Sequence, residues 1–330
     1  MRAGPSPADL LEPIAAYQRS AVIGAAVETG IADALYAGAR SEAEVAEATG
    51  TDPRGALALL GAMVAQGLAL RGGSGFELSP AGCFLAAGHP ASVAGIVRKE
   101  WFFYRVWAEL PEAVRDGHAR IAPWRRRLAD DPATSLDFLR ALDDLASMFG
   151  GELPELAALS GPGRLLDAGG GAGSHAAALV AECEGLEATV LDLPEVEALV
   201  RERHPELRFV AGDLERPRFG RPEEEEWDAV LLANVLHDHP AARCSELVRE
   251  AAGLLRPGGT LLIYEWVIAA DRVSPSEVAM FTPMMLVENE GGWTWTAEEL
   301  GAWVREAGLE PLEPRRGAGP ISVLSARKPG

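Results

Sequence analysis

The segment DAGGGAG, Asp167–Gly173, limits the fold of this chain more than any other stretch, because it places three consecutive glycines just after an acid. The short run before it, Arg164–Leu166, indicates a strand, and the Ala-rich run after it, Ala176–Val180, indicates a helix. Glycine adopts positive φ at little cost and lets a ligand approach the backbone closely. A strand, a glycine turn and a helix N-terminus in this order predict an α/β domain that binds a ligand at the turn.

The spacing of the glycines separates the ligands that such a turn can bind. A dinucleotide site has the pattern G-x-G-x-x-G, but counting from Gly169 the position of the third glycine holds Ser174. The stretch also lacks the Lys-Ser/Thr end of a phosphate-binding loop. The spacing therefore favours the other ligand of such turns, S-adenosylmethionine, and the strands that follow must decide.

Each strand expected after the turn ends in polar residues. The run Ala188–Val196 contains Asp192, at a place where a carboxylate can accept both ribose hydroxyls of an adenosyl group. The run Leu207–Glu215 contains Asp213, which we expect to meet the adenine amino group. The run Trp227–Pro240 is apolar until its end, HDHP. Because ligands of open α/β sheets bind outside the carboxyl ends of the strands, we expect these side chains to share one site.

Five motifs follow one another along the chain: DAGGGAG, VLDLP, AGDLE, VLHDHP and LRPGGTLLIYE. In this order the chain resembles the class I S-adenosylmethionine-dependent methyltransferases. More narrowly, it is similar to the small-molecule O-methyltransferases of plant caffeate type and their bacterial relatives in secondary metabolism, over essentially its whole length. The resemblance implies an α/β fold, in which a Rossmann-like class I methyltransferase domain is preceded by a mostly helical winged-helix dimerisation domain.

The resemblance also implies S-adenosyl-L-methionine as the cofactor. This molecule carries a methyl group on a sulfonium that is already activated for displacement. The protein must therefore hold the acceptor in line and, where the acceptor is a hydroxyl, remove its proton. The residues implied as cofactor-binding are Asp167, Gly169, Gly171, Asp192, Asp213 and Leu214.

His237 is the candidate general base. It stands in VLHD, the segment in which the relatives keep their catalytic histidine, and the alternative is a structural histidine near a helix start. An unperturbed histidine would give activity that rises with pH through about 6 to 7. Of the two carboxylates that orient this histidine in the relatives, one matches Glu265, but the second is replaced by Thr294 in GGWTWT. Either Glu265 alone is enough to orient His237, or the acceptor loses its proton more easily than the acceptors of the relatives do.

A second histidine, His239, stands where the relatives usually have a tryptophan. If the strand continues that far, His237 and His239 face the same side. Such a pair raises the possibility of a metal, as in relatives that methylate α-keto acids at carbon around a bound ion. Two histidines without a third ligand make an incomplete site, so we expect no metal.

The segment FTPMMLVENEGGW matches the substrate-contacting stretch of the relatives. Its methionines would press on a planar substrate and its asparagine would hydrogen-bond it, although a methionine-rich core helix is the alternative. The aromatic run Lys99–Leu110 is either a core helix that packs the domains together or a wall of the substrate pocket. The substrate-binding candidates are Trp107, Met284, Met285, Asn289 and Trp293.

A chain of 330 residues suits two domains better than one. Ser41-x-x-Glu44 fits a capping box, Thr51-Asp52-Pro53 fits a second helix start, and a hairpin is expected through Gly72–Gly75. We predict a winged-helix-like dimerisation domain over 1–95, connecting helices that line an interdomain pocket over 96–160, and the S-adenosylmethionine-binding catalytic domain over 161–330. The last two strands are expected near Leu309–Arg315 and Ile321–Arg327, the final one antiparallel.

The net charge of −19 argues against partners that are nucleic acids or anionic membranes. No apolar run approaches the roughly 20 residues of a membrane span, and the first residues lack the apolar core of a signal peptide. Cys83, Cys183 and Cys244 are far apart and show no metal-ligand spacing, as expected of reduced cysteines. We therefore expect a cytoplasmic protein with a small-molecule substrate, and by resemblance a homodimer.

Together these features predict S-adenosylmethionine-dependent methyl transfer to a hydroxyl of a small aromatic secondary metabolite, with His237 as general base. A C- or N-methyltransferase, for example a metal-assisted enzyme acting on an α-keto acid, is the alternative within enzymes. Outside that class stand a non-catalytic relative that only binds the cofactor, and a winged-helix DNA regulator. The acidic charge disfavours the DNA regulator, since residues 1–95 contain more acids than bases.

Overall fold

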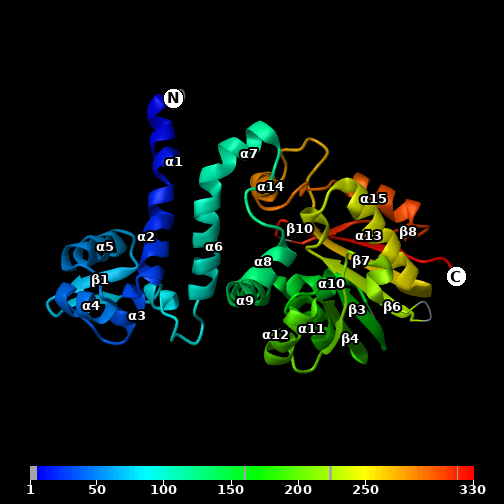
Figure 1. The fold of residues 1–330 in the computed structure, drawn as a ribbon, viewed down its shortest axis with the longest axis horizontal. Coiled ribbons are helices and arrows are strands. Elements are labelled where there is room, and N and C mark those ends of the chain that lie inside the picture. The colour runs from blue at the N-terminus through cyan, green and yellow to red at the C-terminus, as the bar shows by residue number, and fades with distance from the viewer. Residues whose placement is uncertain (1–5, 160, 223–224, 318) are drawn as a thin grey trace. The chain divides into compact units, whose positions relative to one another are not determined.

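The computed structural model describes residues 6–159, 161–222, 225–317 and 319–330. The chain divides into two compact units, Met1–Arg105 and Val106–Gly330 (Figure 1). Within the described ranges, no helix combines the length and the apolar character that a membrane crossing requires.

The first unit is mostly helical and carries a two-stranded hairpin, as the winged-helix prediction requires. Its core contains Ile31, Leu35, Leu60, Met63 and Phe76, each at most 2% exposed. The elements of this unit are η1 (Pro7–Leu10), α1 (Leu11–Ala15), α2 (Tyr17–Glu28), α3 (Ile31–Tyr36), α4 (Glu42–Thr49), α5 (Pro53–Ala65), β1 (Ala69–Gly72), β2 (Gly75–Leu78), η2 (Gly82–Leu85) and α6 (Ala94–Val106).

Local sequence signals start the helices of this unit. The capping box of α4 is confirmed, since the Glu44 N–H donates to Ser41 Oγ at 3.2 Å and the Ser41 N–H donates to Glu44 Oε2 at 2.9 Å. The start of α5 is also confirmed, because Asp52 accepts the Gly55 N–H at 3.0 Å and Pro53 opens the helix. Each cap satisfies backbone donors that a helix N-terminus leaves without partners.

The aromatic run of α6 packs within the first unit. A Cβ atom added at Gly24 would lie 2.1 Å from the Trp101 ring, so α2 and α6 approach closely where glycine leaves room. Trp101 stacks on Tyr104 with ring centroids 4.9 Å apart, and Phe103 is 1% exposed. Phe103 is therefore buried and Trp101 and Tyr104 are half-buried in the first unit, whereas Trp107 follows in the second unit, on η3 (Trp107–Glu109).

The second unit is built on a sheet of eight strands with helices on both faces (Figure 1). The strand order is β5-β4-β3-β6-β7-β10-β8, with β9 paired to β10. Its helices are α7 (Leu110–Asp116), α8 (Trp124–Asp130), α9 (Pro132–Phe149), α10 (Leu153–Ala157), α11 (Ser174–Glu182), α12 (Glu197–Arg203), α13 (Ala241–Leu254), α14 (Ser276–Glu288) and α15 (Ala297–Glu306). Its strands are β3 (Gly163–Ala168), β4 (Leu186–Asp192), β5 (Arg208–Ala211), β6 (Trp227–Ala233), β7 (Leu255–Trp266), β8 (Glu310–Pro311), β9 (Arg315–Arg316) and β10 (Ile321–Arg327).

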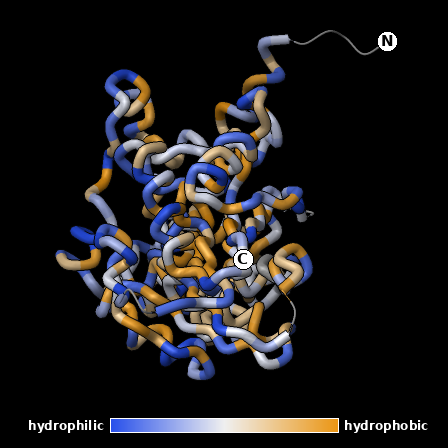
Figure 2. The backbone as a smooth tube through the Cα atoms, turned by 90° about the vertical axis from the view of Figure 1, so that its right-hand side faces the viewer, coloured by the Kyte–Doolittle hydropathy of each residue, from blue (hydrophilic) through white to orange (hydrophobic). Residues whose placement is uncertain are grey.

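The central strands are buried on both faces, which explains their continuous apolar sequences. Along β6, Val230 and Leu232 belong to the core under α13 and α15, while Ala229, Leu231 and Ala233 belong to the core under α10 and α11. Successive side chains of a strand point to opposite faces, so one run serves two cores. Figure 2 shows the hydrophobic segments concentrated inside this unit.

The end of the sheet confirms one expectation and corrects another. Strand β10 pairs antiparallel with β7, as expected. The strand expected at Leu309–Arg315 is wrong as one element, because only β8 and β9, of two residues each, pair with β10. Proline has no N–H to donate to a ladder, and Pro311 and Pro314 fall within that stretch.

Helix α9 is fixed to the sheet unit by one buried carboxylate, that of Asp143, whose side chain is 1% exposed. It accepts hydrogen bonds from Ser174 at the start of α11 and from Arg203 at the end of α12, and its Oδ1 lies 2.8 Å from His204 Nε2. Burial acts to raise the pKa of Asp143, but the bonds from His204, Ser174 and Arg203 outweigh it and lower the pKa to about 2.

The low pKa of Asp143 makes its contribution to stability dependent on pH. Because the folded pKa lies near 2 and the ordinary value is 3.8, the ionised carboxylate stabilises the fold above pH 4, and this stabilisation is lost as the pH falls through 2. We expect wild type to have a larger free energy of unfolding than Asp143→Asn at pH 5. This difference between wild type and variant should shrink by about 2 kcal/mol when the pH is lowered from 5 to 2. Denaturant titrations at each pH measure this difference.

Asp137→Asn is the matched control, since Asp137 lies on the same helix with a side chain that is 75% exposed. Its difference from wild type should stay nearly constant over the same range, because exposed ion pairs contribute little. A difference for Asp143→Asn that does not change with pH would contradict the role given to the ionised carboxylate.

Candidate active site

The predicted site residues gather at the carboxyl ends of the parallel strands. Strand β3 ends beside Asp167 and leads into the glycine turn, and β4 ends at Asp192. Strand β6 leads into the 3₁₀ turn η7 (Leu236–Asp238), and Glu265 lies near the end of β7. Because β3, β4, β6 and β7 are neighbours in one sheet, residues that lie far apart in the chain meet at one edge.

The glycine turn needs glycine for its backbone conformation. Gly169 and Gly171 have φ of +77° and +54°, a region that side chains disfavour. A Cβ atom at Gly169 would also lie 2.9 Å from the Leu214 side chain, so Leu214 packs directly against the turn. The Gly171 N–H donates to Asp192 Oδ2 at 2.8 Å, while Asp192 Oδ1 accepts the Leu193 N–H at 2.7 Å. The Asp192 carboxylate therefore fixes the turn and keeps further lone pairs for a ligand.

Two buried acceptors at this edge have no hydrogen-bond partner among the described residues. They are the carboxylate of Asp167, which is 0% exposed, and Oδ1 of Asn234. Burial, with a smaller contribution from Asp192, raises the pKa of Asp167 to about 7, although the nearby Ala176 N–H acts against this. Buried polar atoms in native proteins are normally hydrogen-bonded. A ligand that brings an ammonium group and hydroxyls, as S-adenosylmethionine does, fits these acceptors and the open backbone of the turn.

Asp213 forms ion pairs within the protein that the sequence did not predict. Its carboxylate pairs with Arg125 of α8 and lies 3.5 Å from Arg216 Nε. Burial acts to raise the pKa of Asp213, but the Glu215 N–H and Arg125 outweigh it and lower the pKa. The contact of Asp213 with adenine therefore stays a prediction, in which Arg125 would share the carboxylate.

The buried carboxylate of Glu265 holds His237. Oε1 of Glu265 accepts the backbone N–H groups of Leu236 at 2.8 Å and His237 at 3.2 Å. Oε2 accepts the Trp266 N–H at 2.9 Å and lies 2.8 Å from His237 Nδ1. A carboxylate that already takes backbone donors acts as an acceptor, so Nδ1 carries a proton and Nε2 is left as the basic nitrogen of the ring.

The charges near His237 change the pH at which activity is expected to rise. Burial would lower the pKa of His237, but attraction by Glu265 and then by Asp238 outweighs burial and raises the pKa to about 9. In this structure the imidazole is therefore protonated at neutral pH. A rise of activity through pH 6 to 7 is the expectation for an unperturbed histidine, and the raised pKa of His237 moves the expected rise to higher pH.

Position 294 lacks a carboxylate, and the structure shows what replaces it. The Thr294 side chain is buried, and its Oγ1 lies 2.6 Å from Thr282 Oγ1. Beside His237 stands Phe281, whose ring meets the imidazole edge-on with centroids 5.0 Å apart. Phe281 also stacks on Trp266 at 4.4 Å. An aromatic stack thus lies against the histidine, while the hydroxyl of Thr294 is bound to α14 through Thr282.

Asn289 and Trp293 lie next to His237. The Asn289 amide donates to Asp238 Oδ1 at 2.6 Å, and that oxygen lies 3.6 Å from His237 Nε2. The Trp293 N–H donates to the His237 carbonyl at 2.9 Å, while Trp293 as a whole is 39% exposed. The segment after α14 therefore positions the turn that carries His237.

The remaining substrate candidates differ in their surroundings. Met285 is 1% exposed and belongs to the core, whereas Met284 and Trp107 are half-buried. Of the two methionines, Met284 has the larger surface to offer to a ligand.

His237 and His239 would form a metal-binding pair only if strand β6 continued through both of them, and it does not. Strand β6 ends at Ala233, and His237 lies in the 3₁₀ turn η7, so His237 and His239 are not on one strand face. Among the residues that the structure describes, no group of three or more His, Cys, Asp or Glu side chains has metal-binding geometry.

Two residues of the site were missed in the sequence. Asn234 has a positive φ of 55°, and its amide lies 3.2 Å from His175 Nε2. Glu288 is 7% exposed and pairs with Arg127, Nη2 to Oε1 3.2 Å. The signal for Asn234 was a polar residue after an apolar strand, and the signal for Glu288 was an acid beside Asn289.

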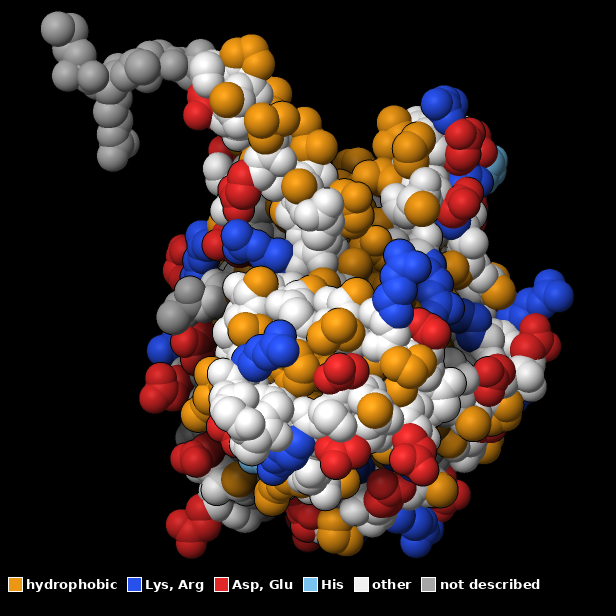
Figure 3. Space-filling view, turned by 90° about the vertical axis from the view of Figure 1, so that its left-hand side faces the viewer, with side chains coloured by type: hydrophobic (Ala, Val, Ile, Leu, Met, Phe, Trp, Pro, Cys, Tyr) orange, Lys and Arg blue, Asp and Glu red, His pale blue; other side chains and the backbone are white. Residues whose placement is uncertain are grey.

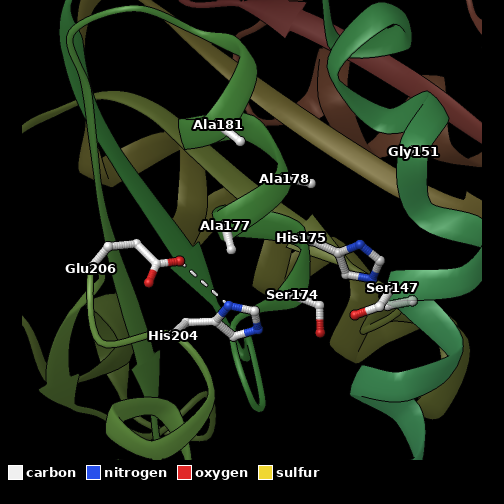
Figure 4. Close-up of a pocket in the computed structure, with 10 residues that line it drawn as sticks. Ser147, Gly151, Ser174, His175, Ala177, Ala178, Ala181, His204 and Glu206 are labelled. Carbon is white, nitrogen blue, oxygen red and sulfur yellow. Dashed lines mark ion pairs between the residues drawn. The ribbon is translucent and has the colours of Figure 1, made fainter. Parts of the chain in front are cut away.

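A pocket of about 390 Å³ lies beside α11, and His175, which lies 3.2 Å from the Asn234 amide, is among its lining residues (Figure 4). Its lining includes alanines of α11 together with Ser147, His175 and His204, and Ser174 lies between the two histidines in the view. None of the predicted catalytic or cofactor-binding residues lines it, so the pocket does not define the reaction site.

The role of Asp192 can be tested by cofactor binding. We expect Asp192→Ala to weaken S-adenosylmethionine binding about tenfold to a hundredfold, because hydrogen bonds to a charged group contribute about 1.5–3 kcal/mol. Calorimetry measures the dissociation constant, with Glu195→Ala as a control, since Glu195 is an exposed acid three residues further on. Unchanged affinity in Asp192→Ala would remove Asp192 from the cofactor site.

Comparison with known proteins places this geometry in a family. Residues 107–310 match the family model of the O-methyltransferase domain. The chain is 32% identical to acetylserotonin O-methyltransferase of Mus musculus, over 95% of this chain and 86% of that protein. It is 31% identical to 3-hydroxy-5-methyl-1-naphthoate 3-O-methyltransferase of Streptomyces sahachiroi, over 92% and 89% of the two chains.

Solved structures agree with the sequence relatives. Human N-acetylserotonin methyltransferase, in complex with S-adenosylmethionine, superposes with a TM-score of 0.86 at 26% identity and full coverage of both chains. The family model matches more than half of the chain. The glycine turn, Asp192 and the His237–Glu265 pair of this chain all lie within the matched residues. The chain therefore belongs to the S-adenosylmethionine-dependent O-methyltransferase family.

Proposed function

We propose that this enzyme methylates a hydroxyl group of a small aromatic secondary metabolite and that His237 is its general base. The observation that carries the proposal is the Glu265 carboxylate, which takes Nδ1 of His237 at 2.8 Å and leaves Nε2 as the basic nitrogen. The relative from Streptomyces sahachiroi acts, by its name, on a hydroxynaphthoate, which is an aromatic acceptor with a hydroxyl group. The half-buried Met284, with Trp107 and Trp293, would contact such a ring.

Different residues would bind the cofactor and transfer the proton. Asp167, Asp192 and the glycine turn would hold S-adenosylmethionine, which supplies a methyl group on a sulfonium when bound. His237 Nε2 would take the proton that the acceptor hydroxyl loses on methylation. Glu265 fixes the tautomer and stabilises the imidazolium that forms, as a buried carboxylate does for a histidine base. Positioning of the two reactants supplies much of the acceleration.

Asn289 takes a different part from the one predicted in the sequence. Its amide donates to Asp238, and so it acts on the proton-transfer side of His237 through that carboxylate. A direct hydrogen bond from Asn289 to substrate would use the amide oxygen, which remains an acceptor.

His237→Ala tests the proposed function. With methyl-labelled S-adenosylmethionine and a panel of phenols, wild type should label an oxygen of the product in the presence of a chelator. On the acceptor found in this way, His237→Ala should lower kcat about 10²–10⁴-fold, because a general base contributes that much. Cofactor affinity should stay nearly unchanged. Turnover within about threefold of wild type would contradict the general-base role, and label on carbon or nitrogen would contradict hydroxyl transfer.

The pH profile gives a second test of the same proposal. Because the free-enzyme pKa of His237 is raised to about 9, kcat/KM should rise with pH through a limb well above 7. Glu265→Gln removes a negative charge beside the imidazole and should move that limb to lower pH while lowering kcat. A limb near the ordinary histidine value of about 6.5 in wild type would show that the carboxylates do not act on the base.

We also propose a homodimer formed through the first unit. The segments η1, α1 and α2 expose apolar side chains on one continuous stretch, which is visible as orange surface towards the top of Figure 3. Leu10, Leu11, Ile14 and Tyr17 are 61%, 65%, 67% and 55% exposed. Exposed apolar patches of this kind are typical of protein interfaces, and a second copy of this chain is the partner that the family resemblance implies.

Light scattering tests the assembly. Wild type at micromolar concentration should show twice the 34.9 kDa of one chain, and Leu11→Glu/Ile14→Glu should shift the mass towards one chain, since charges in an apolar interface are costly. The exposed Val114→Glu, on α7 of the second unit, is the control. A wild type that scatters as a single chain would refute the dimer.

We propose a cytoplasmic location, supported by the three cysteines, all of which are free thiols in the structure. Reduced cysteines are typical of proteins in a reducing compartment. Fractionation of the source cells would test this location.

A further inference from the structure

Arg125, near the start of α8, contacts an acid of the expected cofactor site. Its guanidinium pairs with the carboxylate of Asp213, which follows β5, and its Nε lies 3.7 Å from Glu215 Oε2. The side chain of Asp213 is 15% exposed and that of Arg125 is 49% exposed. The two residues lie far apart in the chain, so the tertiary fold brings this cation to the end of β5.

The geometry of α8 directs Arg125, and not its neighbour, towards the sheet. Leu128 is 1% exposed and belongs to the same core as Leu165 of β3. Residues three positions apart lie on one side of a helix, so Arg125 shares the side of α8 on which Leu128 is buried. The side chain of Arg126 is 75% exposed and pairs with Asp130 of the same helix. Helix α8 therefore presents one arginine to the carboxyl end of β5.

The carboxylate of Asp213 can hold Arg125 and still accept a hydrogen bond from a ligand. Its Oδ1 accepts the Glu215 N–H at 3.0 Å and is also the atom that Arg125 contacts. Its Oδ2 lies 3.5 Å from Arg216 Nε, which is longer than an ordinary hydrogen bond, and the Arg216 side chain is 73% exposed. Each oxygen of an ionised carboxylate can accept more than one donor. Oδ2 is therefore the atom that can accept an amino group.

The next residue of this segment is fixed from another helix. Arg243 of α13 donates to the carbonyl of Leu214, and the Leu214 side chain packs against the glycine turn at Gly169. Arginines from α8 and α13 thus hold two successive residues of the segment that follows β5. The sequence predicts both of these residues, Asp213 and Leu214, to bind the cofactor.

Arg125 also favours the ionised form of Asp213. Burial acts to raise the pKa of Asp213, but the Glu215 N–H and Arg125 outweigh it and lower the pKa. An ionised carboxylate only accepts hydrogen bonds. It suits the amino group of adenine, which is a donor, and disfavours the oxygen that takes its place in hypoxanthine, which is an acceptor. The state of Asp213 therefore bears on which base the site prefers.

We propose that Arg125 is a positioning residue of the cofactor site, which orients Asp213 to accept the amino group of adenine and so sets the preference of the protein for adenosyl ligands. Arg125 acts through Asp213 and need not touch the cofactor itself. The inference rests on the cofactor of the proposed function and on the predicted contact of Asp213 with adenine. It does not depend on the acceptor or on His237, because binding is measured without methyl transfer.

Calorimetry with S-adenosylhomocysteine and the full chain is the direct test. We expect Arg125→Gln to weaken binding about threefold to tenfold, because a charge-assisted contact at a half-exposed site orients the acceptor of the amino group. Arg125→Lys keeps the charge without the planar fork and should lose less affinity. Arg126→Gln is the matched control, since it changes the next residue on the exposed side of α8, and it should bind as wild type does.

Base selectivity gives the readout that a merely structural role would not produce. S-Inosylhomocysteine carries an oxygen in place of the amino group of adenine, so it cannot donate to Asp213. Wild type should prefer S-adenosylhomocysteine by about tenfold or more, since a charged acceptor would be left without its donor. In Arg125→Gln this preference should narrow by the factor lost for the adenosyl ligand. Equal weakening of both ligands would show a general disturbance of α8 and overturn the inference.

A double variant tests whether Arg125 acts through Asp213. Asp213→Asn alone should weaken binding of S-adenosylhomocysteine and narrow the preference for adenine. Adding Arg125→Gln to it should change the dissociation constant by less than about twofold, because the guanidinium then has no charged partner to orient. Effects of the two substitutions that multiply in full would contradict this route.

The remaining outcomes separate this inference from the proposed function. Unchanged affinity in Arg125→Gln would overturn the role of Arg125, and tighter binding would overturn it by showing that the ion pair competes with adenine. Wild-type affinity in Asp213→Asn would refute the adenine contact and the role of Arg125 with it. None of these results depends on whether His237→Ala is active, so the general base and the role of Arg125 can each fail alone.

Discussion

The carboxylate of Glu265 is the interaction on which the reactive geometry depends. It is 2% exposed and receives three backbone N–H groups as well as the imidazole of His237. Strand β7, which carries it, is paired on both sides by β6 and β10, so the sheet sets its place. Leaving such a group without donors would cost much more than one ordinary hydrogen bond. The turn that carries His237 is therefore held by the sheet through a single side chain.

The acids at the other strand ends divide into two kinds. Asp192 uses its oxygens to accept the Gly171 and Leu193 N–H groups, so it builds the glycine turn. Asp167 is more deeply buried and has no hydrogen-bond partner among the described residues. The first kind organises the protein in advance. The second would gain its hydrogen-bond partner only from a ligand, which is the role predicted for Asp167 towards the cofactor.

What the sequence predicts well is local. The glycine turn and the two helix caps follow from short motifs whose spacing reflects helix or strand geometry. The antiparallel last strand and the pairing of His237 with Glu265 were implied by the family resemblance. Burial and distant pairing are not local. The Arg127–Glu288 pair and the donation of Asn289 to Asp238 join residues that are 161 and 51 positions apart, and the core position of Met285 depends equally on the packing around it. The raised pKa of His237 has the same origin, because it sums charges from separate elements.

The substitution at position 294 shows why a motif is an incomplete description of an active site. A base responds to the field of all charges near it, and that field depends on distance and burial rather than on chain position. Thr294 carries no charge and hydrogen-bonds Thr282, yet Glu265 and Asp238 still lie close to His237 and act to raise its pKa. The loss of a carboxylate from one loop can therefore be offset by acids that stay close to the imidazole, here Glu265 at 2.8 Å and Asp238 at 3.6 Å. On this view the requirement of the reaction is a negative environment around one imidazole, and several sequences can meet it.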